Sequence, residues 1–326
     1  MLACQHRPMA WIKHPWARLR TWLAVRLGLW RGRWQRLSLD ARVARWTWWP
    51  WPWGGHTWTA ALYHPAGLAD REPAPLLVLL HGCKQQAMGF AQAAGWVQAA
   101  DAGRFRLLCP QQREGANPFG CWNWFHPPAQ AGSGELDVVL AALARTQAGW
   151  PCTEVQLVGL SSGAGLASLL AFHHAERFSA VASVAGPPLL GPGNLQDPRQ
   201  VLRHGLAISP SVATWRLTTC APMLVLQGEA DEVVNPACAA QLAEQVRTVA
   251  ERQHGRLTEA AADEHAREWH GGDGLRLRLQ RLPGLGHVWT GGPGGHPYVE
   301  RTGPPLTTLV LRFFAAVRQR SAQMGA

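Results

Sequence analysis

The sequence predicts an α/β fold with a mostly parallel sheet and helices on both of its faces. From about Trp58 onward, short apolar runs alternate with segments whose apolar residues recur at helical spacing. Runs such as "PLLVLLH" and "PMLVLQG" are almost continuously apolar, which is typical of strands that are covered on both sides. Regular alternation of such strands with helices indicates a parallel sheet between two helical layers.

The individual elements follow from these two patterns. We expect strands over residues 57–63, 75–81, 104–110, 154–160, 179–186, 222–228 and 275–284. We expect helices over residues 88–102, 135–148, 162–174, 236–253 and 305–318. Residues 187–215 interrupt the alternation with several prolines and glycines, and this segment is interpreted as a cap or a loop.

The positive charge of the chain is concentrated at its start. The 326 residues carry a formal net charge of +10, and the first 39 contain eight basic side chains and no acidic one. From Asp40 onward the counts are 23 basic and 21 acidic, so the main body is nearly neutral. A nucleic-acid-binding surface on the main body is therefore not expected.

The first 55 residues are rich in Arg and Trp and are interpreted as a separate arm. Their apolar side chains recur every three or four residues, which predicts one face of an amphipathic helix: Trp16, Leu19, Leu23, Leu27, Trp30 and Trp34. This helix either docks on the main domain or adsorbs to an anionic lipid surface or a hydrophobic particle. The predicted division is 1–55 for the arm, 56–320 for the main domain and 321–326 for a tail.

Cysteine and histidine spacing gives no indication of a metal site. The seven cysteines are scattered without a C-x-x-C pair, and no H-E-x-x-H motif occurs. We therefore expect no metal, and the acyl-transfer chemistry expected below needs no organic cofactor either. No window of about 20 apolar residues predicts a transmembrane helix, and Arg26 interrupts the apolar stretch that a secretory signal would need.

The segment "VGLSSGAG" provides a candidate nucleophile. Its "GLSSG" fits the G-x-S-x-G pattern in one register only, with Ser161 as the central serine. A predicted strand precedes the motif and a predicted helix follows it, as a nucleophile elbow requires. The alternative is an ordinary loop in which Ser161 or Ser162 caps the helix.

A serine nucleophile needs a base, and the base needs an orienting carboxylate. Asp231 follows the predicted strand "PMLVLQG", with Glu229 and Glu232 as rivals, and His287 follows the predicted strand "LRLRLQRLPG". The order Ser, acid, His is the order expected when these residues follow successive strands of such a sheet. The backbone N–H groups of Ser162, the residue after the nucleophile, and of Cys83, in the loop after an early predicted strand, are the candidate oxyanion donors.

Several segments together resemble the esterase family that includes poly(3-hydroxybutyrate) depolymerases, acetylxylan esterases and feruloyl esterases. They are "PLLVLLHGCKQ", "CWNWF", "VGLSSGAG", "GEADEVVNP", "GLGHVWTGG" and "GPPLTTLVLRFF", and they span about residues 56–317. The resemblance implies the α/β-hydrolase fold, a triad of Ser161, Asp231 and His287, and an oxyanion hole at Cys83 and Ser162. It also implies a disulfide between Cys83 and Cys121, with two reduced thiols as the alternative.

The expected activity is hydrolysis of carboxylic esters through an acyl-enzyme. Short 3-hydroxyalkanoate esters, oligomers or polyester are the first substrate class, and acylated carbohydrate is the alternative. Tryptophan faces suit such substrates, so Trp122, Trp124 and Trp289 are candidate substrate-binding residues, with core packing as the alternative for at least one of the first two.

The alternative hypothesis, from another functional class, is a non-catalytic protein that binds a membrane or a polyester granule through residues 1–55. The resemblance favours an exported or periplasmic location, and a cytoplasmic one is the alternative.

Overall fold

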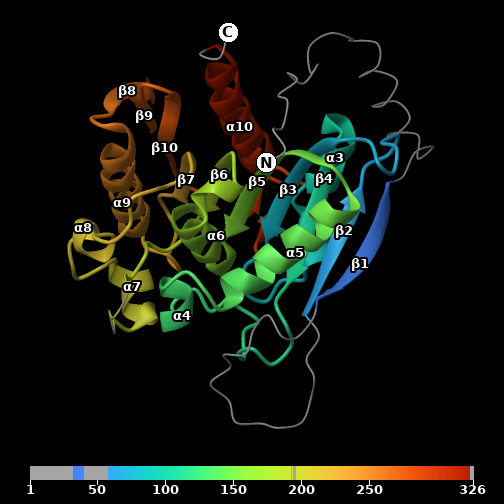
Figure 1. The fold of residues 1–326 in the computed structure, drawn as a ribbon. Coiled ribbons are helices and arrows are strands. Elements are labelled where there is room, and N and C mark those ends of the chain that lie inside the picture. Colours follow the sequence, from blue (N-terminus) through green and yellow to red (C-terminus); the bar gives the residue numbers. More distant parts are fainter. Residues whose placement is uncertain (1–31, 40–57, 192, 194–195, 324–326) are drawn as a thin grey trace.

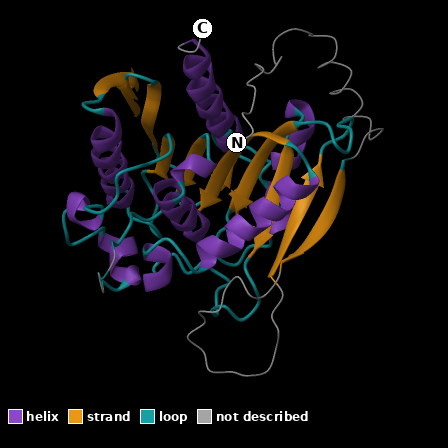
Figure 2. Cartoon of the chain, viewed as in Figure 1, coloured by secondary structure: helices purple, strands orange, loops and turns teal. Residues whose placement is uncertain are grey.

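The computed structural model describes residues 32–39, 58–191, 193 and 196–323. In this part of the chain a ten-stranded sheet runs in the order β1-β2-β4-β3-β5-β6-β7-β10-β9-β8 (Figures 1 and 2). The six strands from β4 to β10 are mutually parallel, while β1, β2, β9 and β8 pair in antiparallel fashion at the two edges. The fold class is therefore the one predicted.

The strands of this sheet have the following bounds: β1 Arg33–Leu39, β2 Trp58–His64, β3 Ala74–Leu80, β4 Arg106–Gln111, β5 Cys152–Leu160, β6 Ala180–Val184, β7 Met223–Gly228, β8 Thr258–Asp263, β9 Ala266–Gly271 and β10 Gly274–Leu282. A separate two-stranded sheet joins β11, Trp289–Thr290, to β12, Val299–Glu300. The helices are α2 Ala87–Ala93, α3 Trp96–Gly103, α4 Pro127–Gln130, α5 Glu135–Gly149, α6 Ser162–His173, α7 Pro198–His204, α8 Pro210–Ala213, α9 Ala237–His254 and α10 Leu306–Gln323, with a 3₁₀ turn at Ala175–Arg177.

Each face of the sheet has its own hydrophobic core, because successive side chains of a strand point to opposite faces. On β3, Leu76, Val78 and Leu80 pack with helices α5, α6 and α9. The intervening Leu77 and Leu79 pack with α2, α3 and α10. All seven residues of β3 are buried, which is why its sequence is continuously apolar and not alternating.

The strand at the β1 edge corrects two predictions. Trp34 was expected on an amphipathic helix, but Arg33–Leu39 is a strand that pairs antiparallel with β2. The Trp34 ring lies 5.0 Å from the ring of Tyr63 on β2, measured between centroids. Residues 33–39 thus belong to the main sheet and not to a separate arm. The remainder of the predicted arm, 1–31 and 40–55, lies outside the described residues.

Three further boundaries differ from those expected. The single helix expected over 88–102 is two helices, because Gly95 adopts a left-handed backbone (φ 81°) between α2 and α3. The hairpin of β8 and β9 was not predicted, since all six residues of β8 are exposed and show no alternation. The tail expected from residue 321 is still helical to Gln323 in α10. No helix within the described ranges is long and apolar enough to cross a membrane.

The place of residues 33–39 in the sheet can be tested with two neighbouring substitutions. Leu37 is 3% exposed in the core, whereas Ser38, on the opposite face of β1, is exposed. Leu37→Asp should lower the free energy of unfolding by about 3 kcal/mol or more, because it buries an unpaired carboxylate. Ser38→Asp should change it by less than about 0.5 kcal/mol. Urea denaturation checks both, and equal small effects would show that β1 is not part of the folded core.

Candidate active site

The candidate site lies where the parallel strands end. Cys83 follows β3, Ser161 follows β5 and Asp231 follows β7, while His287 lies in the loop between β10 and β11. In the sheet β3 adjoins β5, and β7 adjoins β10. The carboxyl ends of parallel strands share one edge of a sheet, so this order brings four distant segments of the chain together.

Ser161 lies on a sharp turn between β5 and α6. Its backbone is left-handed, with φ 57° and ψ −119°, which is costly for a residue with a side chain. Two contacts hold this turn: the Ser161 N–H donates to Val184 O at 2.9 Å, and Ser161 O accepts from the N–H of Gly165 at 3.0 Å. The strained backbone matches the nucleophile elbow that the sequence motif indicates.

The two motif glycines are required by close backbone approach. A Cβ atom on Gly159 would lie 2.2 Å from the carbonyl oxygen of Gly163. A Cβ atom on Gly163 would lie 2.5 Å from the carbonyl oxygens of both Leu80 and His81. Both distances are far below van der Waals contact, and the neighbouring atoms are backbone. The G-x-S-x-G spacing therefore allows α6 to pack directly against β5 and the end of β3.

In the expected triad, His287 lies within hydrogen-bond distance of both Ser161 and Asp231. His287 Nε2 lies 3.0 Å from Ser161 Oγ, and His287 Nδ1 lies 2.8 Å from Asp231 Oδ2. An ionised carboxylate only accepts hydrogen bonds, so it favours the tautomer with the proton on Nδ1. Nε2 is then free to accept the proton of the serine hydroxyl. The imidazole of His287 and the carboxylate of Asp231 are both largely buried.

Asp231 is fixed by four hydrogen-bond donors. Its Oδ1 accepts from the N–H groups of Val233 and Val234 at 2.9 and 2.8 Å. Its Oδ2 accepts from Gln227 Nε2 at 2.9 Å in addition to His287. The Gln227 amide also donates to Val234 O at 3.0 Å, so its NH₂ group, and not its oxygen, must face these acceptors. Gln227 was not identified from the sequence, although it lies near the end of β7, the strand that leads to the acid.

The rival acids and histidines do not reach Ser161. Glu229 and Glu232 are exposed, and Glu229 lies 4.0 Å from Arg281. His173 and His174, on and after α6, contact the backbone oxygens of Gln130 and Gly132. His265 and His270 belong to the β8–β9 hairpin at the far edge of the sheet.

The disulfide between Cys83 and Cys121 is present, with the sulfurs 2.05 Å apart. It ties the loop after β3 to the loop after β4. Ser162 Oγ lies beside this disulfide, 3.4 Å from Cys83 Sγ, and accepts from the N–H of Trp122 at 3.2 Å. Cys83 and Ser162, the two expected oxyanion donors, are thus brought together.

The buried side chain of His81 also stabilises the loop that contains Cys83. Its Nδ1 lies 2.7 Å from Gly82 O, and its Nε2 accepts from the N–H of Gln112 at 3.1 Å. The ring is fully buried beside Trp122, and this burial lowers the pKa of His81 to about 4. Gln85 extends the support: it accepts from the N–H of Gly82 and donates to Pro297 O. These polar supports were also missed, because a single His or Gln after a strand carries no specific signal.

The tryptophans expected to contact substrate are core residues. Trp122 and Trp289 are 0% exposed and Trp124 is 4% exposed. Trp289 packs against Phe90 and Trp96, and its Nε1 donates to Thr307 Oγ1. Their ring faces are occupied by protein, so the prediction that they bind substrate is wrong. The exposed aromatic rings near the site are Tyr298, 5.7 Å from the His287 ring, and Phe119, two residues before Cys121.

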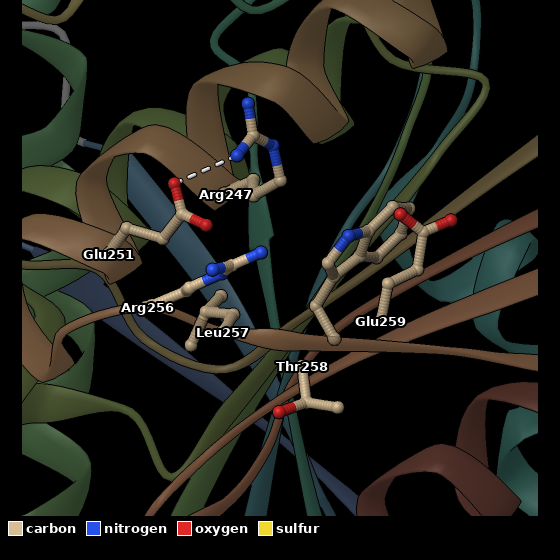
Figure 3. A pocket seen from close by; sticks show the side chains of 7 residues that line it. Arg247, Glu251, Arg256, Leu257, Thr258 and Glu259 are labelled. Carbon is tan, nitrogen blue, oxygen red and sulfur yellow. Dashed lines mark hydrogen bonds and ion pairs between the residues drawn. The ribbon is translucent and has the colours of Figure 1, made fainter.

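A hollow of about 490 Å³ lies elsewhere, between α9 and the β8–β9 hairpin (Figure 3). Arg247 on its wall is already paired with Glu244 and Glu251. Its lining contains no serine, cysteine or histidine, so this hollow offers no alternative to the candidate site at Ser161. No three side chains of the described residues gather into a metal-binding group.

The sheet order and the turn at Ser161 define an α/β hydrolase. Residues 58–266 match the family described as esterase PHB depolymerase, and the chain belongs to this family. This range includes Ser161 and Asp231 but ends before His287.

The curated relatives are similar over part of their length. The chain is 34% identical over 127 residues to a poly(3-hydroxyalkanoate) depolymerase C of Paucimonas lemoignei, and the match spans 38% of this chain and 30% of that protein. It is 29% identical over 123 residues to a poly(3-hydroxybutyrate) depolymerase of Ralstonia pickettii, spanning 35% of this chain and 25% of that one. The matches therefore cover less than a third of each relative.

Solved structures share the fold at low sequence identity. An acetyl xylan esterase from Aspergillus awamori superposes with a TM-score of 0.63 at 16% identity, covering 87% of this chain and 99% of that one. LpqC, a poly(3-hydroxybutyrate) depolymerase from Bordetella parapertussis, gives a TM-score of 0.53 at 18% identity, covering 82% and 88%. These similarities support the α/β-hydrolase fold.

The buried His81 predicts that the folded protein loses stability as the pH is lowered. Its pKa is 6.5 in the unfolded chain and about 4 in the folded protein, so between these values the unfolded state binds the extra proton. The resulting stability is fully present above pH 6.5 and is lost as the pH falls toward 4, by about 3 kcal/mol in all. Urea unfolding of wild type and His81→Gln from pH 7 to pH 4 checks this. The variant should lose less stability over that range, and identical pH dependence would refute the assignment.

Proposed function

We propose that the chain is a serine esterase in which Ser161 is the nucleophile, His287 the general base and Asp231 the orienting acid. The observation that carries this proposal is the continuous chain of contacts from Ser161 Oγ through His287 to Asp231, at 3.0 and 2.8 Å. The strained backbone of Ser161 supports it independently, since such strain gathers at functional positions.

The reaction follows from this geometry in two steps. His287 Nε2 takes the hydroxyl proton as Ser161 Oγ attacks the ester carbonyl, and Asp231 stabilises the imidazolium that forms. The backbone N–H groups of Cys83 and Ser162 donate to the developing oxyanion. His287 then protonates the leaving alcohol and activates a water molecule, which releases the acid from the acyl-enzyme.

The substrates that we propose are short 3-hydroxyalkanoate esters, their oligomers or polyester. Membership of the esterase PHB depolymerase family supports this class, as does the similarity to depolymerases of Paucimonas lemoignei and Ralstonia pickettii. The exposed rings of Phe119 and Tyr298, near the candidate site, suit contact with an aliphatic acyl chain.

Replacement of the nucleophile should abolish turnover. Ser161→Ala is expected to lower kcat for p-nitrophenyl butyrate by about 10⁴-fold or more, because the remaining groups lack a nucleophile. Ser38→Ala, at an exposed serine on β1, is the matched control and should keep the wild-type rate. Equal rates for Ser161→Ala and wild type would contradict the proposal.

Hydrolysis rates on a panel of natural esters decide the substrate class. Release of 3-hydroxybutyrate from its oligomers should exceed the hydrolysis of methyl ferulate or acetylated xylan. Preference for either of the latter two would reassign the enzyme to acylated carbohydrates while leaving the serine mechanism intact.

A further inference from the structure

Lys84 is the only lysine of the described residues, and it lies next to the candidate active site. The whole chain has 29 arginines and two lysines, and Lys84 directly follows Cys83, the proposed oxyanion donor. Its backbone is left-handed, with φ 61°, a conformation that a residue with a side chain rarely adopts. The left-handed turn is held by the Lys84 N–H, which donates to Phe119 O at 2.7 Å.

The side chains of Lys84 and Phe119 form a pair beside the proposed oxyanion hole. The ammonium nitrogen lies 5.7 Å from the centroid of the Phe119 ring, within the range of a cation–π contact. The disulfide from Cys83 to Cys121 and the Lys84–Phe119 backbone bond fasten the two segments side by side. The Phe119 ring is 58% exposed, so the pair faces solvent and a ligand can reach it.

The charge of Lys84 is not neutralised by an acid of the described residues. No carboxylate there lies within ion-pair distance of its ammonium group, whereas many of the arginines are paired. An ammonium is a compact charge on a flexible stem, which can follow a small anion without the fixed fork of a guanidinium. Lys84 directly follows Cys83 in the chain, so its charge belongs to the same loop as the proposed oxyanion donor.

We propose that Lys84 and Phe119 form a subsite for a carboxylate on the leaving alcohol of the ester. An oligomer of a 3-hydroxy acid carries such a group on its last unit, a few bonds from the final ester. The ammonium pairs with the carboxylate, and the Phe119 ring holds the ammonium and covers the aliphatic carbons between. This inference rests on the proposed function and narrows it to short oligomers with a free acid end.

Two substrates with the same internal ester test the subsite. One is the dimer of 3-hydroxybutyrate with a free carboxylate, and the other is the same dimer with a terminal carboxamide, which is neutral. Wild type should cleave the free acid with a kcat/KM about fivefold higher, the size of one exposed ion pair. The preference should shrink in 0.5 M NaCl because salt screens exposed charges.

Lys84→Met, which keeps most of the stem without the charge, should bring the ratio of the two kcat/KM values close to one. Lys84→Arg should retain most of the preference. Arg71→Met removes a positive charge from the exposed loop before β3, at the opposite edge of the sheet, and should leave the wild-type ratio. Thermal melts of all three variants confirm that they fold.

The outcomes separate this inference from the proposed function. Cleavage of the neutral dimer with no preference for the acid, or a preference that survives in Lys84→Met, would overturn the subsite and leave the esterase intact. If wild type cleaves neither of the two dimers and does not cleave p-nitrophenyl butyrate, the proposed function is overturned, and the subsite with it.

Discussion

The left-handed backbone of Ser161 is the constraint on which the rest of the site depends. At φ 57° the residue turns the chain from β5 directly into α6, which points its hydroxyl toward His287. The turn exists only because Gly159 and Gly163 let backbone atoms approach more closely than a Cβ would allow. Strain of this kind persists where the surrounding structure over-determines it. Here the strands on both sides of β5 hold the turn in place, since every residue of β3 and β6 is buried.

Around this turn, the polar supports form a second set of constraints. Gln227 and two backbone N–H groups fix the carboxylate of Asp231, and they leave its Oδ2 aligned with the imidazole. On the other side, His81 and the disulfide hold the loop of Cys83. Catalysis by preorganised groups needs little rearrangement at the moment of reaction. Because Gln227 and His81 are buried, they can hold the proposed catalytic groups in fixed positions.

The sequence was sufficient to predict the parallel sheet and the placement of Ser161, Asp231 and His287 after their strands. Continuous apolar runs predict the strands, and the G-x-S-x-G motif lies between a predicted strand and a predicted helix. The sequence was not sufficient for β1 or β8. Trp34 fits a helical spacing with its neighbours equally well, and the exposed residues of β8 carry no pattern. The sequence also wrongly assigned Trp122, Trp124 and Trp289 to substrate binding. The residues around a tryptophan do not reveal whether its ring faces solvent or the core. Only packing distinguishes the two.

The central claim is that Ser161 attacks carbonyl carbon while Cys83 and Ser162 bind the oxyanion. A crystal structure after reaction with a p-nitrophenyl phosphonate ester tests it most directly, because the phosphonyl group mimics the tetrahedral intermediate. We predict phosphorus bonded to Ser161 Oγ, with the phosphonyl oxygen within hydrogen-bond distance of the N–H groups of Cys83 and Ser162. Phosphorus on another side chain, or a phosphonyl oxygen turned away from both N–H groups, would contradict the account.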